Sequence, residues 1–284
     1  MVPFVAASLY ALVSPFAFAG ADSTPRKPAV APVAIQFVAR VAGAPFVCGQ
    51  EYAALGATKT TASASEFMLF VSNVRLLRPD GSEVPVTLSE DGQFQHENST
   101  LLDFAAGGVG TDCTNASPAT NTTVRGTVAT PGEFTGIRFV LGVPFEQNHQ
   151  DQTSAPSPFS SSRMFWSWNG GYKFVRLDLM SAGGKSAWFV HLGSVGCTPG
   201  GSPTAVPTTC AEPNAPTITL TGFDPLTTPV IADIATLLAT SNLAATRGCM
   251  SSRKSPGCSG VLTAFGVMAA AGASPAQRFF RIAP

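Results

Sequence analysis

Histidine and tryptophan are the residues of this sequence whose types and spacing indicate specific chemistry. The chain has only three histidines. His149 lies in a polar segment, residues 143–151, and His191 ends the apolar run 188–192 directly before a glycine-containing turn. Taken alone, each histidine is more often a hydrogen-bonded surface or partly buried side chain than a ligand. Because neutral imidazole is a common transition-metal ligand, both remain candidates for a metal site.

Two tryptophans one residue apart form the least ordinary motif. If residues 164–174 are extended, Trp166 and Trp168 lie on the same face of a strand, because strand side chains alternate. Such a pair usually packs in a core or forms a stacking platform for a sugar. An intact indole offers only an N–H donor, so an unmodified tryptophan cannot itself bind a metal.

The usual catalytic constellations are poorly represented. The sequence has no GxSxG, HExxH or GxxxxGK[ST] motif, and no GxGxxG motif that leads into a helix. His149 and Asp151 with a serine would make a hydrolytic triad, but no serine stands in a recognisable nucleophile turn. We therefore predict a binding protein that is not an enzyme, with a secreted hydrolase centred on His149 and Asp151 as the third alternative.

Composition excludes several partners. The 284 residues include 17 basic and 17 acidic residues, and the sequence pI is about 6.8. A neutral chain has no counterion-release drive toward nucleic acid and no basic surface for membranes. The 20 phenylalanines supply apolar surface to bury, so the low charge content does not indicate disorder.

The N-terminal stretch predicts export. Residues 2–18 are uncharged and mostly apolar, and a small-x-small pattern ends at Ala19. We expect residues 1–19 to be a removed signal peptide, residues 20–32 a flexible leader rich in Pro, Ala and Ser/Thr, and residues 33–284 one β-rich domain. The mature protein is then soluble and periplasmic, or secreted, and does not span a membrane.

An even number of cysteines in an exported chain favours disulfides over zinc or catalytic thiols. Six cysteines allow 15 pairings, among which the sequence alone does not choose. The short spans 197–210 and 249–258 enclose Gly, Pro and Ser and have the composition of loops closed by a disulfide. Pairing within each span would leave the two remaining cysteines to form one long-range bridge. The resulting pairs are Cys197 with Cys210, Cys249 with Cys258, and Cys48 with Cys113.

Short apolar or alternating runs separated by turn residues predict an all-β fold. We expect an antiparallel β-sandwich or barrel-like domain with disulfide-stapled loops. Only residues 231–238 have helical spacing, so one short C-terminal helix is predicted. The predicted strands cover residues 33–39, 66–76, 122–128, 136–141, 172–179, 187–192 and 217–221.

Several motifs together resemble the MbnP-like family, which comprises exported copper-binding proteins also described as metallo-mystery pair proteins with a four-Cys motif. The resemblance runs from about residue 33 to about residue 266, and its WxW and HLGS-x-GC segments are the most specific. The motifs are FVCG at 46–49, FVSNVRL at 70–76, GVPF with NH at 142–149, MFWSWNGGYKF at 164–174, HLGSVGC at 191–197 and CMS at 249–251.

The resemblance implies a periplasmic protein of copper homeostasis that binds one copper ion as Cu(I). It implies a partner, a dihaem c-type cytochrome of the MauG/cytochrome c peroxidase type (MbnH-like), that oxidises Trp166 to kynurenine. The ligands would be His149, His191 and the modified Trp166, and Trp168 would stay intact behind Trp166. Met164 could lend a thioether, although a core role fits it better.

The main alternative is a secreted β-sandwich module that binds carbohydrate. Trp166, Trp168 and Trp188 would form its stacking platform. That hypothesis requires solvent-exposed indoles, whereas the copper hypothesis requires His149, His191 and Trp166 to lie around one point.

Overall fold

The computed structural model describes residues 1, 3, 30–105, 113, 119–167, 170–184, 186–199, 205–244, 248–268 and 276–283. The predicted signal peptide and most of the predicted leader lie outside these residues. Regular structure begins at Ala31, two residues earlier than the predicted domain start, because Ala31 and Pro32 pair with Val128 and Thr127. Within the described residues, no helix is long and apolar enough to span a membrane.

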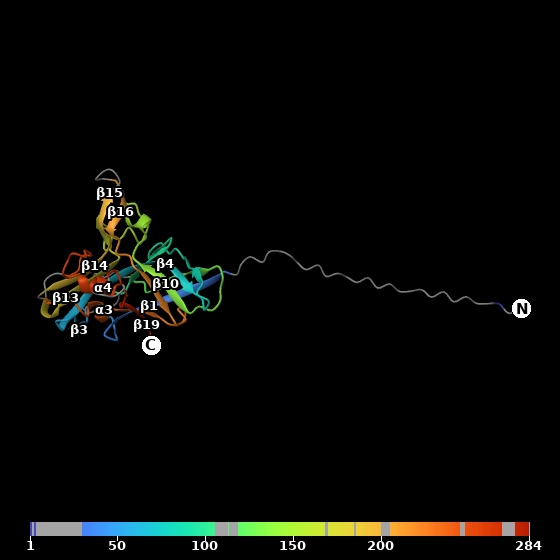
Figure 1. The fold of residues 1–284 in the computed structure, drawn as a ribbon, viewed down its shortest axis with the longest axis horizontal. Coiled ribbons are helices and arrows are strands. Elements are labelled where there is room, and N and C mark those ends of the chain that lie inside the picture. The colour runs from blue at the N-terminus through green and yellow to red at the C-terminus, as the bar shows by residue number, and fades with distance from the viewer. Residues whose placement is uncertain are drawn as a thin grey trace.

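A six-stranded sheet contains the first strand of the domain (Figure 1). Its strand order is β19-β18-β1-β9-β6, with β2 paired to β1. The β1–β18 pair is parallel and the other pairs are antiparallel, so the antiparallel prediction holds with that one exception. The strands are β1 Ala31–Val41, β2 Ala44–Pro45, β6 Thr87–Leu88, β9 Thr123–Val128, β18 Val230–Asp233 and β19 Phe280–Ile282.

A nine-stranded antiparallel sheet carries most of the candidate site. Its order is β14-β13-β4-β10-β17, with β3, β5 and β8 also paired to β4 and β7 paired to β8. Two small hairpins, β11–β12 and β15–β16, accompany it. The strands are β3 Glu51–Leu55, β4 Thr60–Leu77, β5 Glu83–Pro85, β7 Gln95–His96, β8 Ser99–Asp103, β10 Gly136–Leu141, β11 Phe165–Ser167, β12 Gly171–Tyr172, β13 Val175–Ser181, β14 Ala187–Leu192, β15 Val195–Pro199, β16 Pro207–Glu212 and β17 Thr217–Thr221.

The core lies between the two large sheets and is rich in phenylalanine. Phe37 of β1 meets Phe139 of β10 edge to face, with ring centroids 5.5 Å apart, and Phe280 of β19 packs on both rings. All three are at most 2% exposed. The all-β sandwich-like fold predicted from the sequence is therefore confirmed, because the apolar strand faces bury one another as expected.

The helix prediction for residues 231–238 is wrong in its first half. Val230–Asp233 form strand β18, buried on both faces and paired in register with β1, and only Ile234–Leu238 form helix α3. Asp233 ends the strand and caps the helix, since its carboxylate accepts the backbone N–H groups of Ala235 and Thr236.

Further short helical turns occur among the described residues. The polar segment 143–151 contains one turn of helix, α2 Phe145–Asn148. Helix α4 spans Ser259–Ala264, and a 3₁₀ turn spans Ala182–Gly184.

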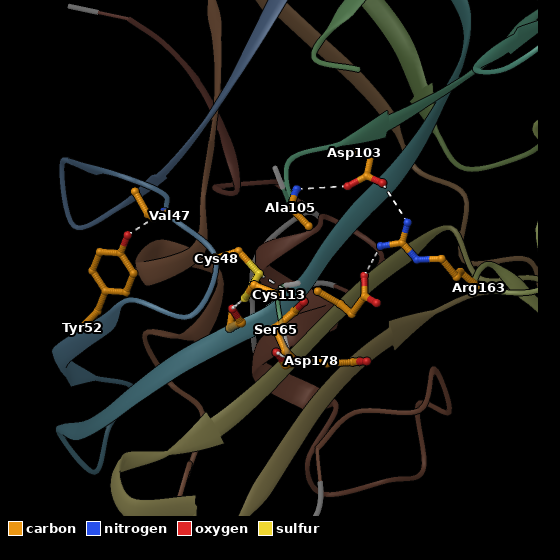
Figure 2. The surroundings of a disulfide bond; sticks show 11 residues. Val47, Cys48, Tyr52, Ser65, Asp103, Ala105, Cys113, Arg163 and Asp178 are labelled. Carbon is orange, nitrogen blue, oxygen red and sulfur yellow. Dashed lines mark hydrogen bonds and ion pairs between the residues drawn. A yellow bond between two sulfur atoms is a disulfide. The ribbon is translucent and has the colours of Figure 1, made fainter. Parts of the chain in front are cut away.

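All three predicted disulfides are present, and no described cysteine is free. Cys48–Cys113 joins segments 65 residues apart in a buried apolar cluster with Ala105 (Figure 2). The Cys48 sulfur also contacts the carbonyl oxygen of Ser65 in β4, at 3.2 Å. This bridge thus ties the first loop of the domain to the long central strand.

A charged cluster lies beside that disulfide. Figure 2 shows Asp103 and Arg163 facing each other, with Arg163 Nη1 3.0 Å from Asp103 Oδ2. Arg163 also pairs with Glu66 of β4. Burial raises the pKa of Asp103 although Arg163 and a backbone N–H act to lower it. Because these charges are paired within the chain, the cluster connects the loop before β11 to the sheet.

Candidate metal centre

His191 is held on the polar face of the β13–β14 hairpin. The strand register places it opposite Arg176 and diagonal to Asp178. Its Nε2 lies 2.6 Å from Asp178 Oδ1, while Arg176 donates to the other oxygen of the same carboxylate. An ionised carboxylate only accepts hydrogen bonds, so Nε2 carries the proton and Nδ1 of the neutral ring holds the free lone pair. A carboxylate behind the imidazole is the usual arrangement for a metal-binding histidine.

Asp178 is suited to this role by its electrostatics. Burial acts to raise the pKa of its carboxyl group, but the hydrogen bonds from His191 and Arg176 outweigh burial and hold the pKa below its ordinary value. Asp178 is only 8% exposed and stays ionised at neutral pH. The carboxylate is therefore a permanent acceptor that orients the His191 ring.

Trp166 lies at the centre of β11, half-buried, with its ring edge-on to His191. The ring centroids are 6.4 Å apart and the planes are inclined by 85°. Gly193 permits this approach, because a Cβ at that position would lie 2.8 Å from the carbonyl oxygen of Tyr172 and 3.3 Å from the Trp166 ring. The structure thus brings two of the three predicted ligands, Trp166 and His191, into contact.

An open cavity of about 310 Å³ adjoins Trp166. The exposed thioether of Met250 forms part of its wall, and this residue follows Cys249, whose carbonyl oxygen accepts the N–H of His191. Ser251 Oγ donates to the His191 carbonyl oxygen, which fixes the loop against β14. The cavity is lined by Trp166, Ser167, Gly170, Ser194, Val195, Gly196, Cys197 and Met250.

His149 directly follows helix α2. It is 4% exposed, and its ring packs edge to face on Phe145 with centroids 5.0 Å apart. His149 Nε2 lies 3.3 Å from Asn148 Nδ2 and 3.7 Å from the sulfur of Cys210. Cys210 is bonded to Cys197, which lines the cavity. His149 is thus linked to the wall of the Trp166 cavity through this disulfide.

His149, Cys197 and Cys210 hold potential ligand atoms within 4.8 Å of one another. The cysteines are joined as a disulfide, however, and the thiolate is the form that binds metal. In this oxidised state the imidazole is the only member of the group with a donor atom suited to a metal.

The remaining predicted residues lie elsewhere. Met164 is fully buried in the apolar core, and Trp168 lies outside the described residues. Trp188 is 3% exposed, so it cannot form part of a sugar-stacking platform. The carboxylate of exposed Asp151 accepts hydrogen bonds from the N–H and hydroxyl of Thr153, so it caps its own turn.

Two contributors were missed by sequence reasoning. Asp178 could have been found, because a hairpin joining the predicted strands 172–179 and 187–192 through the glycines near 183 places residue 178 near 191. Met250 lies within the CMS motif, but only the Cys249–Cys258 disulfide and the contact of that loop with β14 place its side chain at the cavity.

Comparison with protein families matches the MbnP family model over residues 30–251. The chain belongs to the MbnP family. The solved structure of MbnP from Methylosinus trichosporium superposes with a TM-score of 0.76 at 29% sequence identity. The match covers 89% of this chain and 98% of that one. No curated protein matches the sequence. The protein is therefore a methanobactin-related, copper-associated member of the family.

The donor set of the site fits copper. His191 offers Nδ1 with its other nitrogen fixed by Asp178, and imidazole is a good ligand for copper. The polarizable thioether of Met250, which lines the cavity together with Trp166, also suits a soft ion. The intact indole of Trp166 contributes no lone pair, so an additional nitrogen ligand requires its chemical modification.

Proposed function

We propose that this MbnP-family protein is an exported, periplasmic copper-binding protein of copper homeostasis and not an enzyme. It binds one Cu(I) through His149, His191 and a kynurenine derived from Trp166. The observation that carries the proposal is the edge-on contact between Trp166 and a carboxylate-oriented His191 beside an open cavity.

Modification of Trp166 supplies the missing ligand. Conversion to kynurenine begins with a four-electron oxidation, for which an external oxidant such as peroxide supplies one oxygen atom to C2 and one to C3 as the C2–C3 bond of the indole breaks. Water then cleaves the N–C2 bond and releases C2 as formate, which leaves a ketone and an aryl amine. The amine nitrogen has a lone pair that the indole nitrogen lacks. Because the Trp166 ring already lies against His191, the new amine forms close to an imidazole ligand.

The position of Trp166 supports oxidation by a partner protein. Ser167 beside it is exposed, and the adjoining cavity opens to the surface. We infer that the partner is a dihaem c-type cytochrome of the MauG/cytochrome c peroxidase type, because the reaction needs an external oxidant of high potential. The buried Trp188 and the core residue Met164 offer no comparable access.

Peptide mass spectrometry across residues 164–173 of protein from its native compartment, with metal analysis of the same sample, tests the proposal. We expect kynurenine at residue 166 and copper near one equivalent. Copper bound to a chain with intact Trp166 would keep the metal function and refute the modified ligand. Intact Trp166 without copper would refute both.

Ligand variants test the assignment directly. His149→Ala, His191→Ala and Trp166→Phe are expected to fold but lose stoichiometric copper, because each removes a proposed ligand. His96→Ala is the matched control, since His96 hydrogen-bonds to Glu90 outside the site. Trp168→Phe should still be modified at residue 166. Retained copper in any ligand variant, measured by equilibrium competition with a chelator, would refute that ligand.

A further inference from the structure

The Cys197–Cys210 disulfide has an unusual position in the fold. It joins two residues directly opposite each other in the β15–β16 hairpin, with Cα atoms 3.8 Å apart. The hairpin projects from the body of the molecule at the top of Figure 1. Backbone pairing on both sides of the bridge keeps the two cysteines facing each other whether or not their sulfurs are bonded.

A buried imidazole lies against this disulfide. His149 Nε2 is 3.7 Å from the Cys210 sulfur, and the three potential ligand atoms lie within 4.8 Å of one another. The ring also has a contact outside the hairpin, because it packs on Phe145, the first residue of α2. Neither the imidazole nor the cysteines need to move far to face one ion.

Solvent access distinguishes this disulfide from the other two. Cys197 and Cys210 are both half-buried, and Cys197 lines the open cavity beside Trp166. The four cysteines of the other bridges are at most 5% exposed. Thiol–disulfide exchange requires the attacking thiolate to reach a sulfur atom, so a reductant reaches the hairpin bridge first.

We propose that reduction of the Cys197–Cys210 disulfide creates a second soft-metal site, made by two thiolates and His149. An external dithiol supplies two electrons and two protons, the S–S bond breaks, and the dithiol becomes a disulfide. Binding of Cu(I) then displaces the two thiol protons. A set of two thiolates and one imidazole is selective for a soft ion.

This site is an alternative to the site of the function proposed above, which is called the nitrogen site here. It uses neither His191 nor Trp166, but both sites need His149, so one chain fills only one of them. The reduced protein would bind copper through thiolates whether or not Trp166 is modified.

The test uses the full chain, reduced briefly with dithiothreitol and desalted without oxygen. Cu(I) buffered with bicinchoninate is added, and accessible thiols are labelled with N-ethylmaleimide and located by mass spectrometry. We expect two labelled cysteines, 197 and 210, before copper is added. With copper, the reduced His191→Ala chain, which lacks the nitrogen site, should bind one more equivalent than the same variant when oxidised. Labelling should slow by more than about tenfold, because metal-bound thiolate is not free to react.

Matched variants separate the two sites. Cys197→Ser combined with Cys210→Ser should abolish the extra equivalent, and His149→Ala should weaken it by about tenfold or more. Both substitutions are made in the His191→Ala background, which removes the nitrogen site and keeps every ligand of the thiolate site. Near-ultraviolet circular dichroism checks that each reduced protein stays folded.

Several outcomes would overturn the proposal. One is that another disulfide is reduced before Cys197–Cys210, and a second is that the protein unfolds when this disulfide alone is reduced. The others are equal labelling rates with and without Cu(I), and an extra equivalent of copper that is still bound by the double serine variant. If the nitrogen site of the proposed function fails instead, the oxidised wild-type protein binds no copper.

Discussion

The Cys48–Cys113 and Cys197–Cys210 disulfides have contrasting surroundings. Cys48 and Cys113 are buried in an apolar cluster beside the paired charges of Arg163 and Asp103 (Figure 2). The hairpin bridge is half-buried between an imidazole and an open cavity. In the first region the charged side chains pair with one another, whereas in the second the disulfide lies between an imidazole and a cavity lined by Trp166 and Met250.

The contrast separates a structural region from a binding region. Arg163 hydrogen-bonds to the carboxylates of Asp103 and Glu66, so the charges of the first region are already paired within the chain. His191 uses one ring nitrogen on Asp178, which leaves the other nitrogen for an external partner. The same reasoning predicts that substitutions in the first region change stability alone, and those in the second change copper binding.

The largest expected effect is on the structural side. Replacing Cys48 and Cys113 with alanine opens a span of 65 residues. The chain-entropy relation gives a loss of about 4 kcal/mol in the free energy of unfolding. Copper bound per folded chain should stay unchanged, because neither residue adjoins the cavity. Urea unfolding and metal analysis check both statements, and loss of copper from a folded double variant would contradict the division into two regions.

Asp178→Asn is expected to have a smaller effect on stability and a selective effect on copper. The amide can no longer act as a charged acceptor for His191, so we expect copper affinity to fall by about 10- to 100-fold. Chelator competition measures this change. Asp103→Asn is the matched control, because it removes a buried carboxylate partnered by arginine in the structural region. An equal loss of affinity in both variants would mean that Asp178 acts only through general stability.

The sheet architecture was predictable because strand patterning is local. The run 66–76 contains five consecutive buried residues from Phe67 to Val71, and continuous apolar character of this kind indicates a buried strand. The helix prediction failed at residues 231–233, because helical spacing over a few residues does not exclude strand pairing with β1. That pairing joins positions nearly 200 residues apart, so no local pattern reports it.

The site was predictable to the extent that motifs carried it. His191 and Trp166 were identified and lie in contact. The position of His149 against the hairpin disulfide and that of Met250 at the cavity were not predictable, because both depend on how loops closed by disulfides fold back on β14 and α2. Such placement follows from tertiary packing and not from the spacing of residues along the chain.

The smallest expected effect concerns Tyr172, a satisfied polar group at the base of the binding region. Its hydroxyl donates to the Phe159 carbonyl oxygen at 2.8 Å, and burial raises its pKa from 10.0 to about 12. Between these values the unfolded chain loses the proton while the folded chain keeps it. The free energy of unfolding therefore falls as pH rises through this window.

Tyr172→Phe should remove that part of the pH dependence and cost about 1 kcal/mol at neutral pH through the lost hydrogen bond. Urea unfolding of both proteins at about pH 8 and about pH 11 measures the difference. Copper binding should be unchanged, because the hydroxyl faces Phe159 in the core and is bonded there. If the phenylalanine variant lost copper, a hydroxyl that is hydrogen-bonded within the chain would matter for copper binding. The division between a structural region of paired groups and a binding region would then be wrong.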